Sequence, residues 1–477
     1  MNLHVWKWKL VLVTLACVTV LAAQEPDNSE QPKPAGRGIP SLGDANTQDE
    51  NPVEDPLAGW KADTAPLTGL QTPSIGNPEL KHSYWVPGLQ YGSTIQNEPS
   101  GNGSSGDWYS SNYFVGNLSL LEEWSRSQLA LNYSGGGFLT TQSGQNNGWY
   151  QQLALGQNMV WERWQVQILD QFSYLPQSQF GFGGGTGLGV PGISGSLGPS
   201  VPGIGGSVLP NQSIYAAVGS RYTNSFMSQI TYQLSRRGSV TVGGADGLLH
   251  FTQSGSIDTD SYIGNVGYNY MLTKNDSLGV SYRFTSYHYP GQSQSMGDQV
   301  SLAWYGRKIT RRMALQIYGG PDITNYRVLV NNQKQTVEGN GGISLSYAFD
   351  KGGLGASYFH ALSGGSGVLI GSNMDQVTFT GTRRLTRLWS VQGNVGFAKN
   401  RPLTSQSGTQ GNGYNSIYAG GGVNRPIGRD VNFSLAYSAQ IQNVNPTVCA
   451  GSGCSTSSTQ NMITISLQWH TRPFILP

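Results

Sequence analysis

The stretch from Asp258 to Tyr289 has the most regular pattern in the chain and predicts one long β-hairpin. Apolar or aromatic side chains alternate with small polar ones along both halves, which is the period of a strand with one apolar and one polar face. The segment Thr273–Asp276 lies between the halves and has the short polar residues of tight turns. Each half exceeds the ~5–6 residues of an ordinary strand and matches the ~9–11 that cross a membrane as a tilted strand.

Short, mostly basic turns of this kind recur along the chain. They fall at Glu122–Arg126, Glu162–Arg163, Ser235–Gly238, Thr273–Asp276, Thr310–Arg312, Asp350–Gly352, Thr386–Arg387 and Gly428–Asp430. From Ser235 onward their starts lie 36 to 42 residues apart, a period that fits either propeller blades or an array of hairpins. Each repeat contains two long strands rather than four short ones. The pattern therefore predicts a transmembrane β-barrel with its apolar side toward lipid and its polar side toward a lumen.

The strand count follows from the hairpins. A first strand over Tyr84–Gln96, eight hairpins and a closing strand over Ile463–His470 give about 18 strands, within a range of 16–18. The predicted fold is an all-β, antiparallel barrel with short periplasmic turns, longer extracellular loops and both termini in the periplasm. Aromatic side chains near both ends of the strands predict two interfacial belts. Those near the turns are Trp124, Trp161, Trp164, Tyr232, Tyr270, Phe349 and Trp389, and those near the far ends are Tyr113, Tyr222, Tyr262, Tyr287, Tyr289 and Tyr414.

The N-terminal segment has the pattern of a secretory signal peptide over residues 1–23. Lys7 and Lys9 precede an apolar run, Leu10–Leu21, and small residues follow it at Ala22–Ala23. The run is too short to cross a bilayer as a helix. An exported chain reaches an oxidising compartment, so Cys449 and Cys454 are expected to form a disulfide, with two free thiols as the alternative.

Residues 24–81 and 82–477 differ sharply in composition. The first segment is rich in Pro, Asn and acidic residues and predicts a disordered periplasmic tail, with partner docking or a lumenal plug as alternatives. The second is the predicted barrel. Only 11% of the whole chain is charged and 37% hydrophobic, which is unusual for a soluble enzyme. The net charge of +2 gives no argument for nucleic-acid binding, and no cofactor or metal site is expected.

The barrel region resembles the outer-membrane β-barrels of Gram-negative bacteria, porin-like proteins among them. The resemblance lies in hairpins such as LTKNDSLGVSYRF and LTRLWSVQGNVGF and in the closing strand ITISLQW, and it indicates no single family. It implies an outer-membrane location, contact with outer-membrane lipids and insertion by the assembly machinery; a homo-oligomer is possible. One departure is that His470–Pro477 extends beyond Trp469, because such barrels usually end on the aromatic residue of the last strand.

A barrel protease is the enzymatic alternative, and the sequence gives it little support. Asp258 and Asp260 resemble half of the paired-carboxylate site of omptin-like outer-membrane proteases, with Asp246 and His250 across the same loop. Such a site needs a His–carboxylate pair facing the two aspartates. The spacing differs from that family, whose barrel is also much smaller. We therefore expect ordinary polar loop residues, no catalytic residue and no enzymatic activity.

The predicted lumen wall is mostly neutral. Its candidate lining residues are Arg221, Asn265, Asn269, Arg283, Gln316, Gln376, Arg384, Gln392, Asn394, Ser434 and Gln440, with the three arginines as its few charges. Neutral hydrogen-bonding walls suit small polar solutes, so passive diffusion of such solutes is the first hypothesis. The second is a conduit for polysaccharide or hydrophobic cargo gated by the uncharged loop 176–210. The third is a non-conducting, adhesin-like surface barrel.

Asp170 breaks the predicted alternation. It shares a face with Trp164, Val166 and Tyr174, where a carboxylate would meet lipid. Because such a position is costly, we expect either a β-bulge or a different register there.

Overall fold

The structure is a computed structural model that describes residues 83–97, 108–141, 147–175, 221–252, 257–330, 333–365, 370–403, 414–444 and 457–475. The predicted signal peptide, the tail 24–81, loop 176–210 and the pair Cys449–Cys454 lie outside these residues. Among the described residues, no helix is long and apolar enough to cross a membrane.

The described residues form one antiparallel sheet of long strands. Its strands are β1 (Tyr84–Asn97), β2 (Trp108–Glu123), β3 (Ser127–Thr140), β4 (Gly148–Val160), β5 (Trp164–Leu175), β6 (Arg221–Gln233), β7 (Gly238–Phe251), β8 (Thr259–Met271), β9 (Asp276–His288), β10 (Ser295–Thr310), β11 (Met313–Val330), β12 (Gln333–Phe349), β13 (Gly352–Gly365), β14 (Ile370–Arg384), β15 (Ser390–Pro402), β16 (Tyr414–Ile427), β17 (Val431–Val444), β18 (Ser457–His470) and β19 (Phe474–Ile475).

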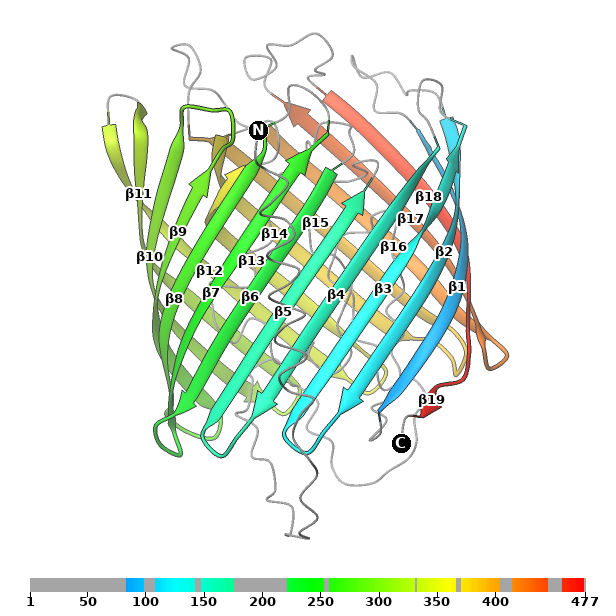
Figure 1. Ribbon diagram of the computed structural model, residues 1–477, viewed down its shortest axis with the longest axis horizontal. Helices are drawn as coiled ribbons and strands as arrows, with labels where there is room; N and C mark the ends of the chain where they lie inside the picture. The colour runs from blue at the N-terminus through cyan, green and yellow to red at the C-terminus, as the bar shows by residue number, and fades with distance from the viewer. Residues whose placement is uncertain are drawn as a thin grey trace, which may run out of the picture. The chain divides into compact units, whose positions relative to one another are not determined.

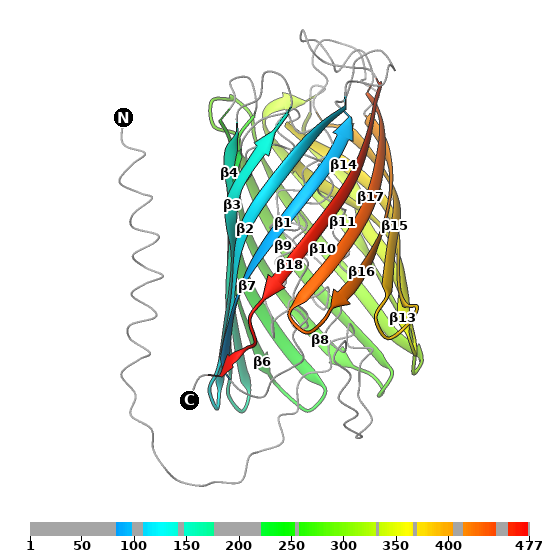
Figure 2. The ribbon, with the colours of Figure 1, turned by 90° about the vertical axis from the view of Figure 1, so that its right-hand side faces the viewer.

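The sheet closes into a barrel because its first long strand pairs with its last. Each long strand pairs with its sequence neighbours, and β1 also pairs with β18 from Gly88↔His470 to Gln96↔Met462. Figure 1 shows β2 to β8 side by side at a common tilt, and Figure 2 shows β1 beside β18. The predicted antiparallel barrel of 18 long strands is confirmed.

The residues beyond Trp469 add a short piece of sheet. β19 pairs with the start of β1 through Tyr84↔Ile475 and Trp85↔Phe474, and the Trp85 and Phe474 rings stack with centroids 4.9 Å apart. The extension that departs from the usual barrel terminus therefore continues the closing seam.

All eight predicted turns join consecutive strands at one end of the barrel, here called the turn end. The opposite end is the loop end. The turn after β8 shows why the sequence turns where it does. Thr273 Oγ1 accepts hydrogen bonds from the backbone N–H groups of Asn275 and Asp276 at 3.1 and 3.0 Å and donates one to the Asp276 carboxylate at 2.6 Å. Backbone groups in the turn cannot form interstrand hydrogen bonds, and these local hydrogen bonds satisfy them instead.

Side-chain exposure alternates along the strands as the pattern predicts. On β17, Leu435, Tyr437 and Ile441 are exposed, whereas Ser438, Gln440 and Gln442 are buried. In a closed sheet the exposed series faces outward and the buried series faces inward. The outward series is apolar on most strands. Each long strand is hydrogen-bonded to a neighbour on both of its edges, so few backbone N–H and C=O groups are left unpaired against lipid.

Aromatic side chains gather outward at the turn end, as predicted for a belt. Trp124, Trp161 and Trp164 are exposed, and the Trp164 ring lies 4.4 Å from that of Tyr232. The guanidinium of Arg425 lies 5.1 Å from the centre of the Trp389 ring. At a membrane interface the apolar ring of Trp or Tyr can contact lipid while its N–H or O–H group contacts water or headgroups.

The predicted belt at the loop end is partly wrong. Tyr222 and Tyr262 are exposed and outward, but Tyr113, Tyr287 and Tyr289 are buried on the inner face. The prediction used distance from the turn alone. Successive side chains of a strand point to opposite faces, so residues an odd number of positions apart lie on opposite faces. Tyr287 is three positions from the outward Phe284 and therefore points inward.

Strand β10 reverses the expected alternation. Its buried inner face is largely apolar and includes Met296, Val300, Leu302 and Trp304, while Ser301 and Ala303 are exposed outward. Packing inside the barrel explains the inversion. Gly279 on β9 lies opposite Trp304, and any side chain at this glycine would collide with the indole. The rule that apolar side chains face lipid is therefore wrong for this strand.

The expectation of a bulge or shifted register at Asp170 is also wrong. The ladders of β5 with β4 and with β6 continue without a register shift. Asp170 therefore stays on the outward face, where it accepts a hydrogen bond from Asn224 Nδ2 at 3.3 Å. Asn224 belongs to the same outward face of the neighbouring β6, so the carboxylate finds its partner without turning inward.

Two adjacent positions on β17 test the alternation. Leu435 is outward, while Ser434 is inward, with its hydroxyl 2.5 Å from that of Ser466. Leu435→Arg should cost ~2–4 kcal/mol of folding free energy if it lies near the bilayer midplane, whereas Ser434→Arg should still assemble. The folded fraction after refolding into lipid vesicles, read by heat-modifiable gel mobility, measures both. Equal folded fractions for the two variants would show that the register is wrong.

Candidate functional site: the inner wall of the barrel

The predicted lumen residues all lie on the inner faces of their strands. Arg221, Asn265, Arg283, Gln316 and Gln440 are buried, and the remaining six are of intermediate exposure: Asn269, Gln376, Arg384, Gln392, Asn394 and Ser434. Each alternates with an outward-facing neighbour. Contact of these residues with a solute stays a prediction.

Some of these residues are brought together by neighbouring strands. Gln376 Nε2 donates to Thr378 Oγ1 at 3.2 Å and to Tyr418 Oη at 3.5 Å, and the two hydroxyls lie 3.1 Å apart. Asn265 is the ladder partner of Arg283. The inner wall is thus a surface of side-chain hydrogen bonds spread over many strands, and the predicted candidates do not converge on one point.

The inner wall also carries two carboxylates that are not among the predicted lining residues. Asp298 on β10 has 0% exposure, and its Oδ2 lies 3.3 Å from Nη2 of Arg283. Asp322 on β11 is also buried and accepts a hydrogen bond from Asn340 Nδ2 at 3.1 Å. Burying a charge is costly unless it is paired and hydrogen-bonded, which accounts for these contacts.

The prediction that arginines are the lumen's few charges is therefore corrected. The rule that apolar side chains face lipid would place Asp298 outward, because it shares a face of β10 with Val300 and Leu302. A usable signal existed: an inward Arg283 requires an acidic partner on an adjacent strand, and Asp298 lies on the next one along the chain.

An apolar cluster lies near the loop end on the inner side of the same strands. We call it the aromatic cluster; its buried members are Tyr287, Tyr289, Met296, Tyr326, Val330 and Leu362. Tyr289 also donates from Oη to the carbonyl oxygen of Gly364 at 2.6 Å, in a buried contact. This bond joins the end of β9 to the end of β13, which are not neighbours in the sheet.

The ladder between β12 and β13 is incomplete toward the loop end. Pairing runs from Phe349↔Gly352 to Gly341↔His360 and stops there. Strand β12 nevertheless continues to Gln333, and β13 continues to Gly365. The two strands therefore separate beyond His360, and we call this separation the fork.

Beyond the fork, the sheet overlaps itself. Leu362 shares strand parity with Leu354, which is outward and 56% exposed, yet Leu362 is only 5% exposed. It packs in the aromatic cluster against residues from the inner faces of β9 to β11. The outward side of β13 thus lies beneath the inner side of those strands.

Two glycines make this close overlap possible. A side chain on Gly364 would overlap the ring of Tyr287, and a Cβ on Gly371 would lie 2.8 Å from Cε of Met296. Gly371 also has a φ of +69°, a conformation that non-glycine residues rarely adopt. The chain approaches so closely here that only a hydrogen fits at either position.

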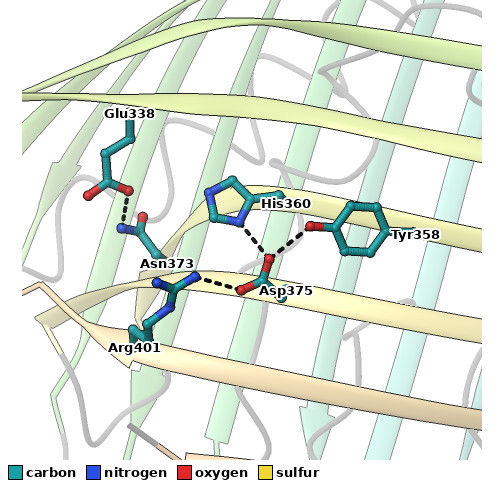
Figure 3. A network of polar contacts seen from close by, with 6 residues as sticks. All are labelled: Glu338, Tyr358, His360, Asn373, Asp375 and Arg401. Carbon is teal, nitrogen blue, oxygen red and sulfur yellow. Dashed lines mark hydrogen bonds and ion pairs between the residues drawn. The ribbon is translucent and has the colours of Figure 1, made fainter. Parts of the chain in front are cut away.

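A polar network lies at the fork, shown in Figure 3. It contains Glu338, Tyr358, His360, Asn373, Asp375 and Arg401, which come from β12, β13, β14 and β15. Asp375 accepts hydrogen bonds from Tyr358 Oη at 3.0 Å, His360 Nδ1 at 2.7 Å and Arg401 Nη2 at 2.9 Å. One carboxylate therefore ties β13, β14 and β15 together.

The second contact of the network crosses the fork. Asn373 Nδ2 donates to Glu338 Oε2. Glu338 shares strand parity with the buried, inward Asn340, while Asn373 shares parity with the outward Phe379. The Glu338–Asn373 hydrogen bond therefore joins the inner face of β12 to the outer face of β14. The aromatic cluster makes the same kind of inner-to-outer contact with apolar side chains.

The residues considered for a protease site lie elsewhere. His250 Nδ1 is 2.5 Å from Asp258 Oδ2, in a pair that is partly exposed at the loop end. Asp246 and Asp260 share strand parity with the outward Val242 and Tyr262, so they belong to the outer face and not to the inner wall. In the described ranges, no group of three or more His, Cys, Asp or Glu side chains is placed to hold a metal ion.

A closed antiparallel barrel with an apolar outer band and a polar inner wall is a transmembrane β-barrel of the kind found in bacterial outer membranes. Comparison with protein families finds no family that matches this chain, and comparison with curated proteins finds no match.

Comparison with solved structures finds matches of low sequence identity. The crystal structure of OpdQ from Pseudomonas aeruginosa covers 83% of this chain and 100% of its own, with 8% identity and a TM-score of 0.41. OccAB4 from Acinetobacter baumannii covers 83% and 99%, with 9% identity and a TM-score of 0.41. The outer membrane protein opdK from Pseudomonas aeruginosa covers 81% and 99%, with 9% identity and a TM-score of 0.42. These values are too low to transfer a function from those proteins to this chain.

The buried ion pair on the inner wall gives a stability prediction. Arg283→Met leaves the Asp298 carboxylate buried without its ion-pair partner and should lower the free energy of unfolding by roughly 3–5 kcal/mol. Arg307→Met is the control, because Arg307 is exposed and its Nε lies 3.6 Å from Asp276, in a surface pair that water and salt screen. Urea unfolding in lipid vesicles measures both. Similar losses in the two variants would contradict the assignment of a buried inner pair.

Proposed function

We propose that this protein is a passive outer-membrane channel for small polar solutes. The observation that carries the proposal is the polar inner wall of a closed barrel of 18 long strands. Barrels of 16–18 strands leave an aqueous channel unless something fills them. Buried amides and hydroxyls on that wall are stable only when they meet water, a polar solute or one another.

The chemistry of the wall favours solutes that are largely neutral. Gln, Asn, Ser and Thr dominate the inward series, and the carboxylate of Asp298 is compensated by Arg283. Such a wall offers donors and acceptors with little net field, which suits hydroxylated molecules such as sugars more than ions.

We further propose that the turn end faces the periplasm. Short turns lie on that side in outer-membrane barrels, and longer loops lie outside. Tyr84 and Ile475 are ladder partners near the turn end, so both ends of the described barrel would be periplasmic.

Two adjacent residues of β17 allow a matched test of conduction. Ser438 is buried on the inner wall and Tyr437 is exposed on the outer wall. In planar bilayers, the wild type should give stable ohmic steps that added sugars block. Ser438→Trp should lower the unit conductance because the indole narrows the lumen, while Tyr437→Trp should leave it unchanged. Folded fractions of both variants are compared by heat-modifiable mobility.

Absence of current in both the correctly folded wild type and the correctly folded variant Leu362→Ala, which loosens the aromatic cluster, would contradict the channel proposal and favour a non-conducting surface barrel. Steps that sugars do not block, together with strong ion selectivity, would retain the channel but reject neutral solutes.

A further inference from the structure

We propose that the described residues 361–365 of β13 and 370–375 of β14, at the loop end of the β13–β14 hairpin, are a gate of the channel, folded beneath the wall of β9 to β12 and hinged at the fork. The inference rests on the proposed channel function. The hairpin's position inside the circumference is set by the aromatic cluster and by the Tyr289–Gly364 hydrogen bond. Swinging the hairpin outward would return it to the place that a complete β12–β13 ladder would give it.

The fork begins at about the height where the hydrocarbon layer would end, and beyond it backbone groups no longer need a partner strand. Nine ladder pairs join β12 to β13. At ~3.4 Å per residue and a tilt of ~40°, nine pairs span roughly 23 Å of height, close to the ~25 Å of the apolar band. Separation of the strands beyond this height leaves backbone groups to water or lipid headgroups instead of hydrocarbon. Movement there has no large desolvation penalty.

The moving part is tied together internally. Asp375 on β14 accepts hydrogen bonds from His360 on β13 and from Arg401 on β15. The ladder of β14 with β15 runs as far as Ser372↔Pro402. Strand β15 in turn stays paired with β16 as far as Asn400↔Tyr414. The hairpin is therefore the free edge of a continuous sheet, and it can move by flexing of that sheet without breaking its ladder pairs.

The contacts across the fork are few and reversible. Among the described residues they include the Tyr289–Gly364 and Glu338–Asn373 hydrogen bonds and the packing of Leu362, Ile370 and Leu403 with the aromatic cluster. Strand β13 leaves its ladder with β12 directly after the Gly341↔His360 pair, so the hairpin would turn at His360 on β13.

A reversible tether across the fork tests the gate. Cys17, Cys449 and Cys454 are first replaced by Ser, and Glu338→Cys with Asn373→Cys is then joined by a short bifunctional thiol reagent that a reductant cleaves. The control pair is Tyr437→Cys with Asn461→Cys, whose native side chains share a 2.9 Å hydrogen bond between the fully paired strands β17 and β18. Single-channel recording is made before tethering, after it and after reduction.

Before tethering, the channel should alternate between a low and a high conductance level. The tether at the fork should remove the high level, and reduction should restore it, while the control tether leaves both levels. Leu362→Ala weakens the closed packing and should raise the ratio of time spent at the high level to time at the low level about tenfold or more. Leu354→Ala, on the outward face of the same strand below the fork, should not change that ratio.

Two outcomes would overturn the inference in distinguishable ways. A single steady level that neither the fork tether nor Leu362→Ala alters would remove the gate and leave the channel standing. Folded wild type and folded Leu362→Ala that both pass no current would remove the channel and the gate with it. Current in Leu362→Ala alone would support a gate that is closed in the wild type.

Discussion

Backbone hydrogen bonding in a medium without water is the constraint on which this structure depends. Every peptide group at hydrocarbon depth needs a partner within the protein, so an antiparallel sheet can cross the membrane only if it closes. The pairing of β1 with β18 meets this requirement, and β19 extends it beside the start of β1. Closure fixes which side chains face outward, and this alternation separates an apolar exterior from a polar inner wall.

The same constraint explains where the barrel departs from regularity. The nine pairs of the β12–β13 ladder reach about the height of an apolar band, and the two strands separate beyond them. Beyond that point Leu362, whose parity is outward, lies beneath another part of the wall. Inside the barrel, the buried pair of Arg283 and Asp298 obeys a related rule, because a charge away from water needs a nearby counter-charge. Both features lie on strands β9 to β14, so the specialised part of the wall is confined to one side.

The fold was predictable because the strand pattern is local and repeated. Turn residues such as Thr273 and the alternation of β8 and β9 need no tertiary information. The inner wall was predictable where one face is clearly apolar, as at Ser434 and Leu435. It was not predictable on β10, where Trp304 packs inward against a glycine, or at Tyr287, whose face depends on exact parity. The fork was beyond reach of the sequence, because the overlap joins strands that are not neighbours and leaves no periodic signal.

The central claim, a membrane-spanning barrel with a watery inner wall, is tested most directly by a spin-label scan of residues 434–441 on β17 in lipid vesicles. Collision rates with oxygen report lipid, and those with a polar nickel complex report water. We expect collision rates that alternate with a period of two, with oxygen favoured at Leu435, Tyr437 and Ile441 and nickel favoured at Ser434, Ser438 and Gln440. Absence of alternation would contradict the barrel, and inward positions reached by neither reagent would contradict an aqueous lumen.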